Sequence, residues 1–571
     1  MSVNRQTYTL PEKLANDVNA SLEDWKKKGK IQRLWQEDAA LWTGSDEDKW
    51  LGWLDITGKQ IEDIEKLKQL AADIKRTGFR NALLLGMGGS SLCPEVLRLT
   101  FGKTPGYPDL HVLDSTDPAQ IKAIEAKVDL ASTICIVSSK SGSTLEPNIY
   151  KQYFFERIKE KVGPKEVGNC FIAITDPGSK LQRVADKDKF RKTFMGVPSI
   201  GGRYSAISNF GMVPAAVMGI DVLKFLKSTQ KMVEACGADT DALTNPGVVL
   251  GTILGVAAKH GRDKLTIVTS RDIFDLGAWL EQLIAESTGK VGTGIIPVDR
   301  ERLAKPDTYG TDRVFAYLRL ESDPDKEQAT AIDALAKAGN PVVRIVLPDI
   351  YHLGQEFFRW EIATAVAGTL LGINAFNQPD VEASKTETRK LTTEYETTGK
   401  LPPESQFFTG DGLKLYADIK NTVALKGGGT LTGFLKKHLS RIGPGDYFGV
   451  LGYLTMNDAN EEALQAIRLA VRDNKKVATV LGFGPRFLHS TGQLYKGGPN
   501  SGVFLQITCD DAVDILVPGQ KYTFGVVKAA QARGDFAVLA DRGRRALRVH
   551  LGKDIAAGLA TLAGAVNQAL A

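Results

Sequence analysis

The chain has 571 residues, of which 43% are hydrophobic and 24% charged, and its formal net charge is +5. This composition is typical of a globular protein of about three or four domains. So small a net charge excludes a strong overall attraction to polyanions, and we expect no nucleic-acid partner. The densest basic run, Arg542–Arg548, is expected to be a solvated helix face.

Several features favour a cytoplasmic location. The N-terminal stretch lacks the apolar core of a signal peptide. No window approaches the ~18 uninterrupted apolar residues of a transmembrane helix, so we expect no membrane partner. The five cysteines are scattered without C-x-x-C spacing, which is typical of reduced core thiols. The six histidines show no metal-ligand spacing, and we expect neither a metal nor an organic cofactor.

Residues 1–75 are predicted to form an amphipathic helical segment. It carries five tryptophans, which we expect to pack on the following domain: Trp25, Trp35, Trp42, Trp50 and Trp53.

From residue 76 to 235, short apolar runs alternate with helical stretches, as in a doubly wound parallel sheet. Each apolar run ends in turn-forming residues, which should meet at the carboxyl edge of the sheet, where ligands bind. The predicted strands are Asn81–Leu85, His111–Leu113, Ile134–Ser138 and Cys170–Thr175.

Two further α/β units follow, at 236–395 and, smaller, at 430–571. The fold class is therefore α/β, with two doubly wound lobes that are similar in kind and a C-terminal unit. In the second unit the strands are Leu265–Ser270, Gly294–Pro297, Val314–Leu320 and Val342–Leu347, before a long helix over 355–371. In the third they are Tyr447–Leu454, Val477–Leu481 and Val503–Thr508, with a helix over 461–474.

The turn after the third strand of the first unit is rich in hydroxyl groups. Residues 138–146 read SSKSGSTLE and lead into a helix. Free N–H groups at a helix start favour an anion, and Ser and Thr add donors, so this turn is a candidate phosphate cradle. It lacks the P-loop spacing. An ordinary Ser or Thr N-cap is the competing interpretation, and the residues alone leave both open.

Two glycine-rich turns could also approach a ligand. The turn at 86–91 reads GMGGSS, but it fails the dinucleotide fingerprint because Ser91 replaces the last glycine. The turn at 200–205 places Arg203 behind two glycines, where its guanidinium could stabilise an oxyanion. A purely structural ion pair is the alternative for Arg203.

One helical stretch offers a candidate base. Gln282 and Glu286 are four residues apart and share a helix face. Gly289 fits a helix stop, so Glu286 should meet the negative end of the helix dipole, which would raise the pKa of its carboxyl toward a useful range. A surface pair with Lys290 is the competing interpretation. Further along, Lys385 could act on a ring or phosphate oxygen, or simply be solvated.

Five stretches together resemble the glucose-6-phosphate isomerase family. They follow the family order over roughly residues 45–390, and their combination is far more specific than any one alone. Within the family the chain is most similar to the isomerase portion of fused transaldolase/glucose-6-phosphate isomerase proteins, although no transaldolase segment is recognisable. The stretches are GMGGSSLCPEVL (86–97), SKSGSTLEP (139–147), GGRYSAIS (201–208), AESTGK (285–290) and NAFNQPDVEASK (374–385).

The resemblance implies a role for each matching residue. It implies that Arg203 stabilises a cis-enediolate and that Glu286 moves the proton between C2 and C1 of the sugar. It further implies that Gln378 and Lys385 contact the ring and assist its opening. The implied substrate-binding residues are Gly89 and Ser90 at the sugar, Ser139, Lys140, Ser141 and Thr144 at the phosphate, Gly202 at the reacting carbons, and Gln282, which orients the substrate.

The sequence does not decide which side chain opens the sugar ring. The family uses a histidine in a segment of the form H-x-x-x-Q-x-x-H-x-G, placed between the Glu and Lys motifs. Only His352 lies there, and its surroundings do not match. A closer likeness starts at His489 and includes Gln493, although the catalytic position would then fall near Tyr495 or Lys496. The candidates are His489, Lys496, His352 or none of them.

The implied function is reversible isomerisation of D-glucose 6-phosphate and D-fructose 6-phosphate, a step of glycolysis and gluconeogenesis, on sugar-isomerase (SIS-type) lobes. The implied partners are a hexose 6-phosphate and a second copy of the chain in a homodimer. Two alternatives remain: a sugar-phosphate-binding sensor without catalysis, and an isomerase with a broader range, such as mannose 6-phosphate.

Overall fold

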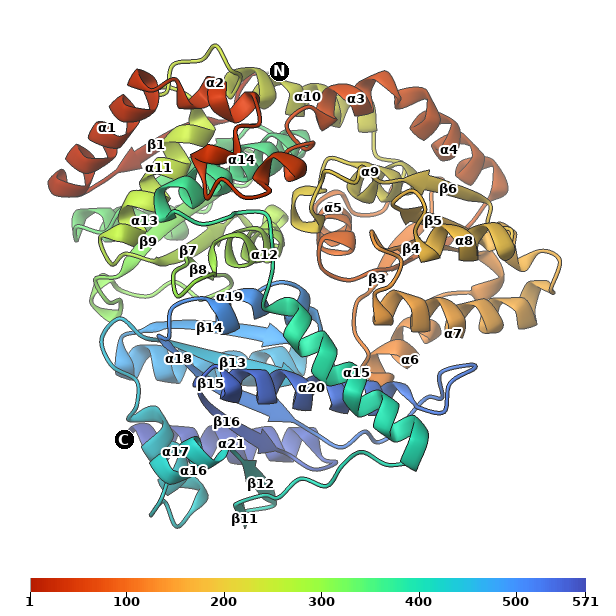
Figure 1. Cartoon of the computed structure of the whole chain (residues 1–571), viewed down its shortest axis with the longest axis vertical. Helices are drawn as coiled ribbons and strands as arrows, with labels where there is room; N and C mark the ends of the chain where they lie inside the picture. The colour runs from red at the N-terminus through yellow and green to blue at the C-terminus, as the bar shows by residue number, and fades with distance from the viewer. Residues whose placement is uncertain (1) are drawn as a thin grey trace.

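The computed structural model describes residues 2–571 and contains three α/β units, each built on its own sheet. Figure 1 shows the first unit in orange, the second in green and the third in blue. The predicted fold class is confirmed by these three sheets and their flanking helices. No helix within residues 2–571 is both long and apolar enough to cross a bilayer.

The first unit has a five-stranded sheet in the order β3-β2-β4-β5-β6, in which all neighbours are parallel. β4 and β5 are buried along their whole length, as expected for strands covered by helices on both faces. The strands are β2 (Asn81–Leu85), β3 (Asp109–Leu113), β4 (Thr133–Ser138), β5 (Phe171–Thr175) and β6 (Lys192–Met195). The helices are α5 (Leu92–Phe101), α6 (Pro118–Lys127), α7 (Leu145–Val162), α8 (Lys180–Lys187) and α9 (Asn209–Val217).

The second unit has a sheet in the order β1-β10-β9-β7-β8, parallel except for its edge strand β1. The strands are β1 (Arg5–Thr9), β7 (Lys264–Thr269), β8 (Ile296–Val298), β9 (Arg313–Leu320) and β10 (Val342–Leu347). The helices are α10 (Val222–Ala235), α11 (Pro246–Lys259), α12 (Leu276–Thr288), α13 (Lys326–Lys337) and α14 (Leu353–Leu371).

The third unit has a six-stranded sheet in the order β11-β12-β16-β15-β13-β14. Strands β16, β15, β13 and β14 are parallel, and the β11–β12 hairpin is added antiparallel beside β16. The strands are β11 (Phe408–Gly410), β12 (Leu413–Tyr416), β13 (Tyr447–Tyr453), β14 (Ala478–Phe483), β15 (Gly502–Thr508) and β16 (Arg545–His550). The helices are α16 (Ile419–Ala424), α17 (Leu431–Leu439), α18 (Asp458–Lys475), α19 (Gly492–Gly497), α20 (Phe524–Asp541) and α21 (Ile555–Leu570).

The N-terminal segment packs mainly on the second unit, and not on the first unit that directly follows it, where its tryptophans were expected to pack. Trp35 donates its indole N–H to the Cys236 carbonyl at 2.9 Å, and Trp42 donates to the Ala365 carbonyl at 2.8 Å. The helices of this segment are α1 (Glu12–Lys27), α2 (Lys30–Trp35), α3 (Ile56–Glu62) and α4 (Ile64–Thr77).

The third unit turns the carboxyl ends of its strands toward the first unit. Thr455, which follows β13, donates to Asp117 at 2.8 Å, and Arg486, which follows β14, pairs with Asp114 at 3.2 Å. Both aspartates follow β3, so the carboxyl edges of the first and third sheets face each other. The buried Lys528 of α20 adds an ion pair to Asp117 at 2.9 Å. The helix α15 (Val381–Thr398) leads into the third unit and packs along α20 (Figure 1).

Three expectations need correction. Residues 1–75 are not wholly helical, because β1 completes the second sheet through pairing with β10. The third unit starts before residue 430, because β11 and β12 belong to its sheet. The run Arg542–Arg548 is not a helix face, since it leads into strand β16, where Arg548 is buried.

Candidate active site

Two glycine turns meet at the base of the site. A Cβ on Gly89 would lie 1.9 Å from the carbonyl oxygen of Gly202, so the turn after β2 can approach the turn before Arg203 only without a side chain. Gly88 has φ +57°, and a Cβ there would lie 2.7 Å from the carbonyl oxygen of His489. Ser90 is buried at the same turn. Residues from the first and third units are therefore in direct contact.

The helix α12 carries the candidate base. It ends at Thr288 before Gly289, as predicted, and both Gln282 and Glu286 are buried. Gln282 Nε2 donates to Glu286 Oε2 at 3.1 Å and to the His489 carbonyl at 2.7 Å. The side-chain amide of Gln282 therefore links the Glu286 carboxylate of the second unit to the backbone of His489 in the third unit.

Arg203 lies opposite Glu286, with its Nη1 atom 3.6 Å from Glu286 Oε1 and only 2% of its side chain exposed. The guanidinium is held by hydrogen bonds from Nε to Ser287 Oγ at 2.7 Å and from Nη1 to Gln378 Oε1 at 3.1 Å. Its Nη2 atom donates to the Ala375 carbonyl at 2.8 Å. A fixed guanidinium beside a carboxylate can stabilise negative charge that develops where the carboxylate removes a proton.

The alternative of a surface pair between Glu286 and Lys290 is wrong. Lys290 is 2% exposed, and its Nζ donates to the carbonyl of Asn374 at 2.6 Å.

His489 reaches the site from the third unit. Its Nε2 atom lies 2.9 Å from Glu146 Oε1, at the first turn of α7. Gln531 of α20 donates to the same oxygen at 2.6 Å and accepts from Thr116 Oγ1 at 2.7 Å. Burial acts to raise the pKa of the Glu146 carboxyl, but the adjacent His489, together with a backbone hydrogen bond and the charge of Lys385, leaves the pKa lowered.

The other ring-opening candidates lie elsewhere. Lys496 is buried and pairs with Asp535 at 2.6 Å inside the third unit. His352 lies at the start of α14, where its Nδ1 atom is 3.0 Å from Asp349 and its carbonyl accepts from Asn4. Of the three candidates, His489 is the one that contacts Gln282.

The hydroxyl-rich turn lies between β4 and α7. Thr144 occupies the N-cap position of α7 but makes no capping hydrogen bond with its side chain, which counts against an ordinary N-cap. Ser139 is buried, whereas Ser141 is exposed and hydrogen-bonds Ser143 at 2.9 Å. Lys140 pairs with Asp176 and donates to the Pro198 carbonyl at 3.1 Å.

Within the described residues, Lys385 forms neither a hydrogen bond nor an ion pair with Arg203 or Glu286. It lies on α15, 40% exposed, and its Nζ atom pairs with Glu382 at 2.7 Å. Its charge nevertheless contributes to the lowered pKa of Glu146.

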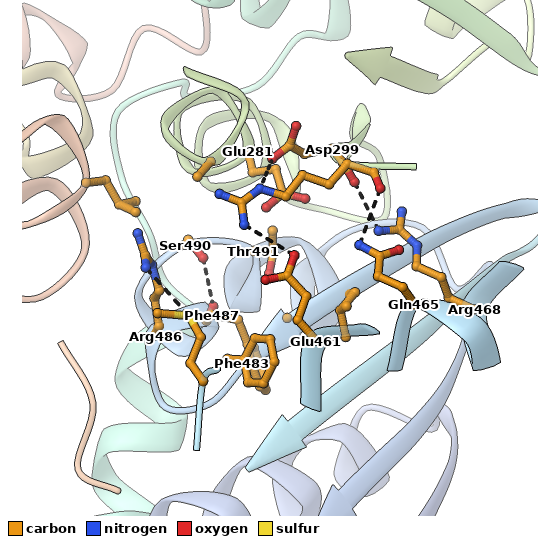
Figure 2. A pocket seen from close by; sticks show the side chains of 16 residues that line it. Glu281, Asp299, Glu461, Gln465, Arg468, Phe483, Arg486, Phe487, Ser490 and Thr491 are labelled. Atoms are coloured by element: carbon orange, nitrogen blue, oxygen red, sulfur yellow. Dashed lines mark hydrogen bonds and ion pairs between the residues drawn. The ribbon is translucent and has the colours of Figure 1, made fainter. Parts of the chain in front are cut away.

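A cavity of about 80 Å³ lies behind the histidine segment, where the three units meet (Figure 2). Its lining includes Arg486, Ser490 and Thr491 of the third unit and Glu281 of α12. Burial, followed by the nearby charge of Asp299, raises the pKa of Glu281 to about 8.

Sequence reasoning missed two residues at the site. Glu146 lies inside the matching stretch 139–147, and its place in the first turn of a helix was the feature of the sequence that could have identified it. No sequence pattern pointed to Gln531 as a site residue. It lies on a long helix, and the contact of that helix with the first unit depends on how whole domains pack.

Residues 64–300 match the family model described as phosphoglucose isomerase. The chain is 30% identical over 359 residues to the glucose-6-phosphate isomerase of Methanocaldococcus jannaschii, over 57% of this chain and 86% of that protein. It is 28% identical over 417 residues to the glucose-6-phosphate isomerase of Leptospira interrogans, over 64% of this chain and 91% of that protein.

Two solved structures share the fold. A hypothetical protein from Thermus thermophilus superimposes with a TM-score of 0.57 at 23% identity, over 67% of this chain and 99% of its own. A glucose-6-phosphate isomerase from Chlamydia trachomatis superimposes with a TM-score of 0.52 at 20% identity, over 66% of this chain and 79% of its own. At these identities the likeness concerns the fold alone.

Proposed function

This chain belongs to the phosphoglucose isomerase family, and from that premise we propose that it interconverts D-glucose 6-phosphate and D-fructose 6-phosphate through a cis-enediolate. The observation that carries the proposal is the approach of Arg203 Nη1 to Glu286 Oε1 at 3.6 Å, with both side chains largely buried. The reaction needs one base that moves a proton between neighbouring carbons and one cation that stabilises the resulting oxyanion.

Glu286 is the proposed base. It takes the proton from C2 of the open aldose and returns it to C1, and it does the reverse from the ketose. Gln282 supports this role because it donates to Glu286 and so fixes the direction of the carboxylate. Arg203 is proposed to stabilise the enediolate oxygens, and Gly202 gives the intermediate room beside it.

The phosphate is proposed to bind at the turn between β4 and α7. The backbone N–H groups at the start of α7 are a suitable anion site, to which hydroxyl groups and one ammonium group add donors. Lys140 would exchange its pairing with Asp176 for the phosphate. The residues in this role are Ser139, Lys140, Ser141 and Thr144, with Gly89 and Ser90 at the sugar.

Ring opening is assigned to His489. Its contact with Glu146 supports the assignment, because a carboxylate stabilises the protonated imidazole that forms when the ring oxygen and hydroxyl exchange protons. Gln378 and Lys385 are proposed to contact the ring from the opposite side. Lys385 would have to leave Glu382 to do so.

Three finer points are proposed as well. We propose that the chain is most similar to the isomerase portion of fused transaldolase/isomerase proteins. We propose that its lobes are bounded near residues 76, 235 and 395, except that α10, which ends at residue 235, already packs on α14 of the second unit. We also propose a homodimer, for which light scattering on the purified chain is the direct measurement.

A coupled assay tests the function. The purified chain should convert glucose 6-phosphate into fructose 6-phosphate, and parallel reactions with mannose 6-phosphate measure the breadth of its substrate range. Binding of fructose 6-phosphate without any isomerisation would overturn the proposal and identify a sensor.

A further inference from the structure

Arg203 depends on a short backbone segment for most of its hydrogen bonds. Its Nη2 atom donates to the carbonyls of Ala375 and Asn377, at 2.8 and 3.1 Å, and its Nη1 atom donates to the Gln378 side chain. A shift of segment 375–378 would therefore move the guanidinium relative to Glu286. This segment follows α14 as an irregular loop, so something other than helix hydrogen bonds must fix its shape.

The side chain of Asn374 fixes the conformation of segment 375–378. Its Oδ1 atom accepts from the backbone N–H groups of Phe376 at 2.9 Å and Asn377 at 3.2 Å, which closes the loop locally. Its Nδ2 atom donates to Asp46 Oδ1 at 2.8 Å, which ties the loop to the N-terminal segment. All three of these bonds use one buried side chain.

Lys290 fixes the same residue from the other side. Its Nζ atom donates to the Asn374 carbonyl at 2.6 Å, and the side chain is 2% exposed. Among residues 2–571, no carboxylate lies within ion-pair distance of Lys290. Burial, followed by the charge of Arg203, holds the pKa of Lys290 well below its usual range. In either protonation state the Lys290 side chain donates a hydrogen bond to this carbonyl, so its Nζ atom is directed to Asn374 and not to Glu286.

Resting on the proposed isomerase function, we propose that Lys290 and Asn374 are positioning residues that hold segment 375–378 so that Arg203 keeps its guanidinium beside Glu286. Neither residue needs to touch the substrate. Their effect should fall on the intermediate that Arg203 stabilises and not on the binding of the ground-state sugar phosphate.

The test compares Lys290→Met and Asp46→Ala with the wild type. Lys290→Met keeps the length of the side chain and removes the donor, whereas Asp46→Ala removes the partner of Asn374 at a partly exposed position. We expect kcat to fall by up to ~100-fold with KM nearly unchanged, because small displacements of a catalytic group cost rates of this order. The inhibition constant of the hydroxamate of 5-phosphoarabinonic acid, a planar anionic mimic of the enediolate, should rise in parallel.

Lys264→Met is the matched control. Lys264 is also 2% exposed and also donates to a carbonyl, that of Gly445 at 2.6 Å, but it lies between the second and third units and pairs in addition with Asp263 and Asp312. Thermal melts should register the loss of a buried lysine in both variants, whereas only Lys290→Met should change kcat and affinity for the mimic.

A double-mutant cycle with Arg203→Lys decides whether the effect passes through Arg203. If it does, Lys290→Met should cause little further loss of kcat in the Arg203→Lys background. Equal losses in both backgrounds would overturn the proposal, and so would a Lys290→Met variant with wild-type kcat and wild-type affinity for the mimic. A wild-type protein without isomerase activity would instead refute the proposed function, so the two failures are distinct.

Discussion

His489 Nε2 lies 2.9 Å from Oε1 of Glu146, although the two residues are 343 positions apart in the chain. The contact brings the third unit to the first, while Gln282 of the second unit holds the His489 carbonyl. The proposed site therefore uses side chains from all three units of one chain. The C-terminal unit therefore contributes to the proposed site through its contacts with Glu146 and Gln282.

The role of His489 in ring opening can be separated from proton transfer. His489→Asn should slow turnover of fructose 6-phosphate by roughly 100- to 10,000-fold, the usual contribution of a general acid–base. Turnover of 5-deoxyfructose 6-phosphate, which lacks the hydroxyl that closes the ring, should be nearly unaffected. Equal losses with both substrates, measured in the same assay, would assign His489 to another step.

Substitution of Lys140 tests the phosphate turn. Lys140→Met should raise KM for hexose 6-phosphates by about tenfold, because it removes one charge-assisted contact, and leave kcat nearly unchanged. Lys151→Met is the control, since Lys151 makes a similar ion pair with Asp188 from α7 outside the turn. The same KM for both variants would place the phosphate elsewhere.

Glu281 should make stability depend on pH. Its folded-state pKa is raised to about 8, mainly by burial, so the unfolded chain releases this proton first and the unfolding free energy falls between pH ~4.3 and pH 8. Glu281→Gln removes this decline. We expect the melting temperature of Glu281→Gln to increase relative to that of the wild type as the pH rises from 5 to 9.

The exposed Glu462, which pairs with Arg302, supplies the control for that series. Glu462→Gln should follow the wild-type melting curve across the same pH range. A gap between Glu281→Gln and the wild type that stays constant with pH would show that Glu281 is ionised in the folded protein.

Self-association should not be needed for catalysis. Because Arg203, Glu286 and His489 belong to one chain, we expect specific activity to remain constant when the protein is diluted below the dissociation constant of any dimer. Light scattering at each concentration gives the oligomeric state. A fall in specific activity that follows dissociation would mean that a partner chain completes the site.

The sequence predicts the parallel strands well, because their signal is local. Asn81–Leu85 coincides with β2, and the other buried runs agree with strands to within a few residues. A strand that is covered on both faces is a continuous apolar run, so it can be recognised without knowing which strands pair with it. The end of α12 at Gly289 was also predicted, but for another reason than glycine's backbone freedom, because Gly289 has φ −77° and a Cβ there would lie 2.4 Å from the Cα atom of Leu494.

Strand β16 could not be predicted in this way. Its arginines suggest a solvated surface, yet Arg545 pairs with Asp446 at 2.6 Å and Arg548 pairs with Glu404 at 2.8 Å. Those partners lie far away in sequence. Lys290 could not be placed from sequence for the same reason. Its spacing from Glu286 suggested an ion pair on a helix surface, whereas its actual partner, the carbonyl of Asn374, lies 84 positions away in the chain.

Hydrogen exchange at the reacting carbons is the most direct test of the proposed chemistry. Glucose 6-phosphate in D2O should exchange deuterium at C2 as it is converted by the wild-type protein, whereas Glu286→Gln should bind the sugar within a few fold of the wild type and introduce almost none. Wild-type rates of exchange and conversion in Glu286→Gln would contradict the assignment of the base, and so would binding by the wild type with neither exchange nor conversion.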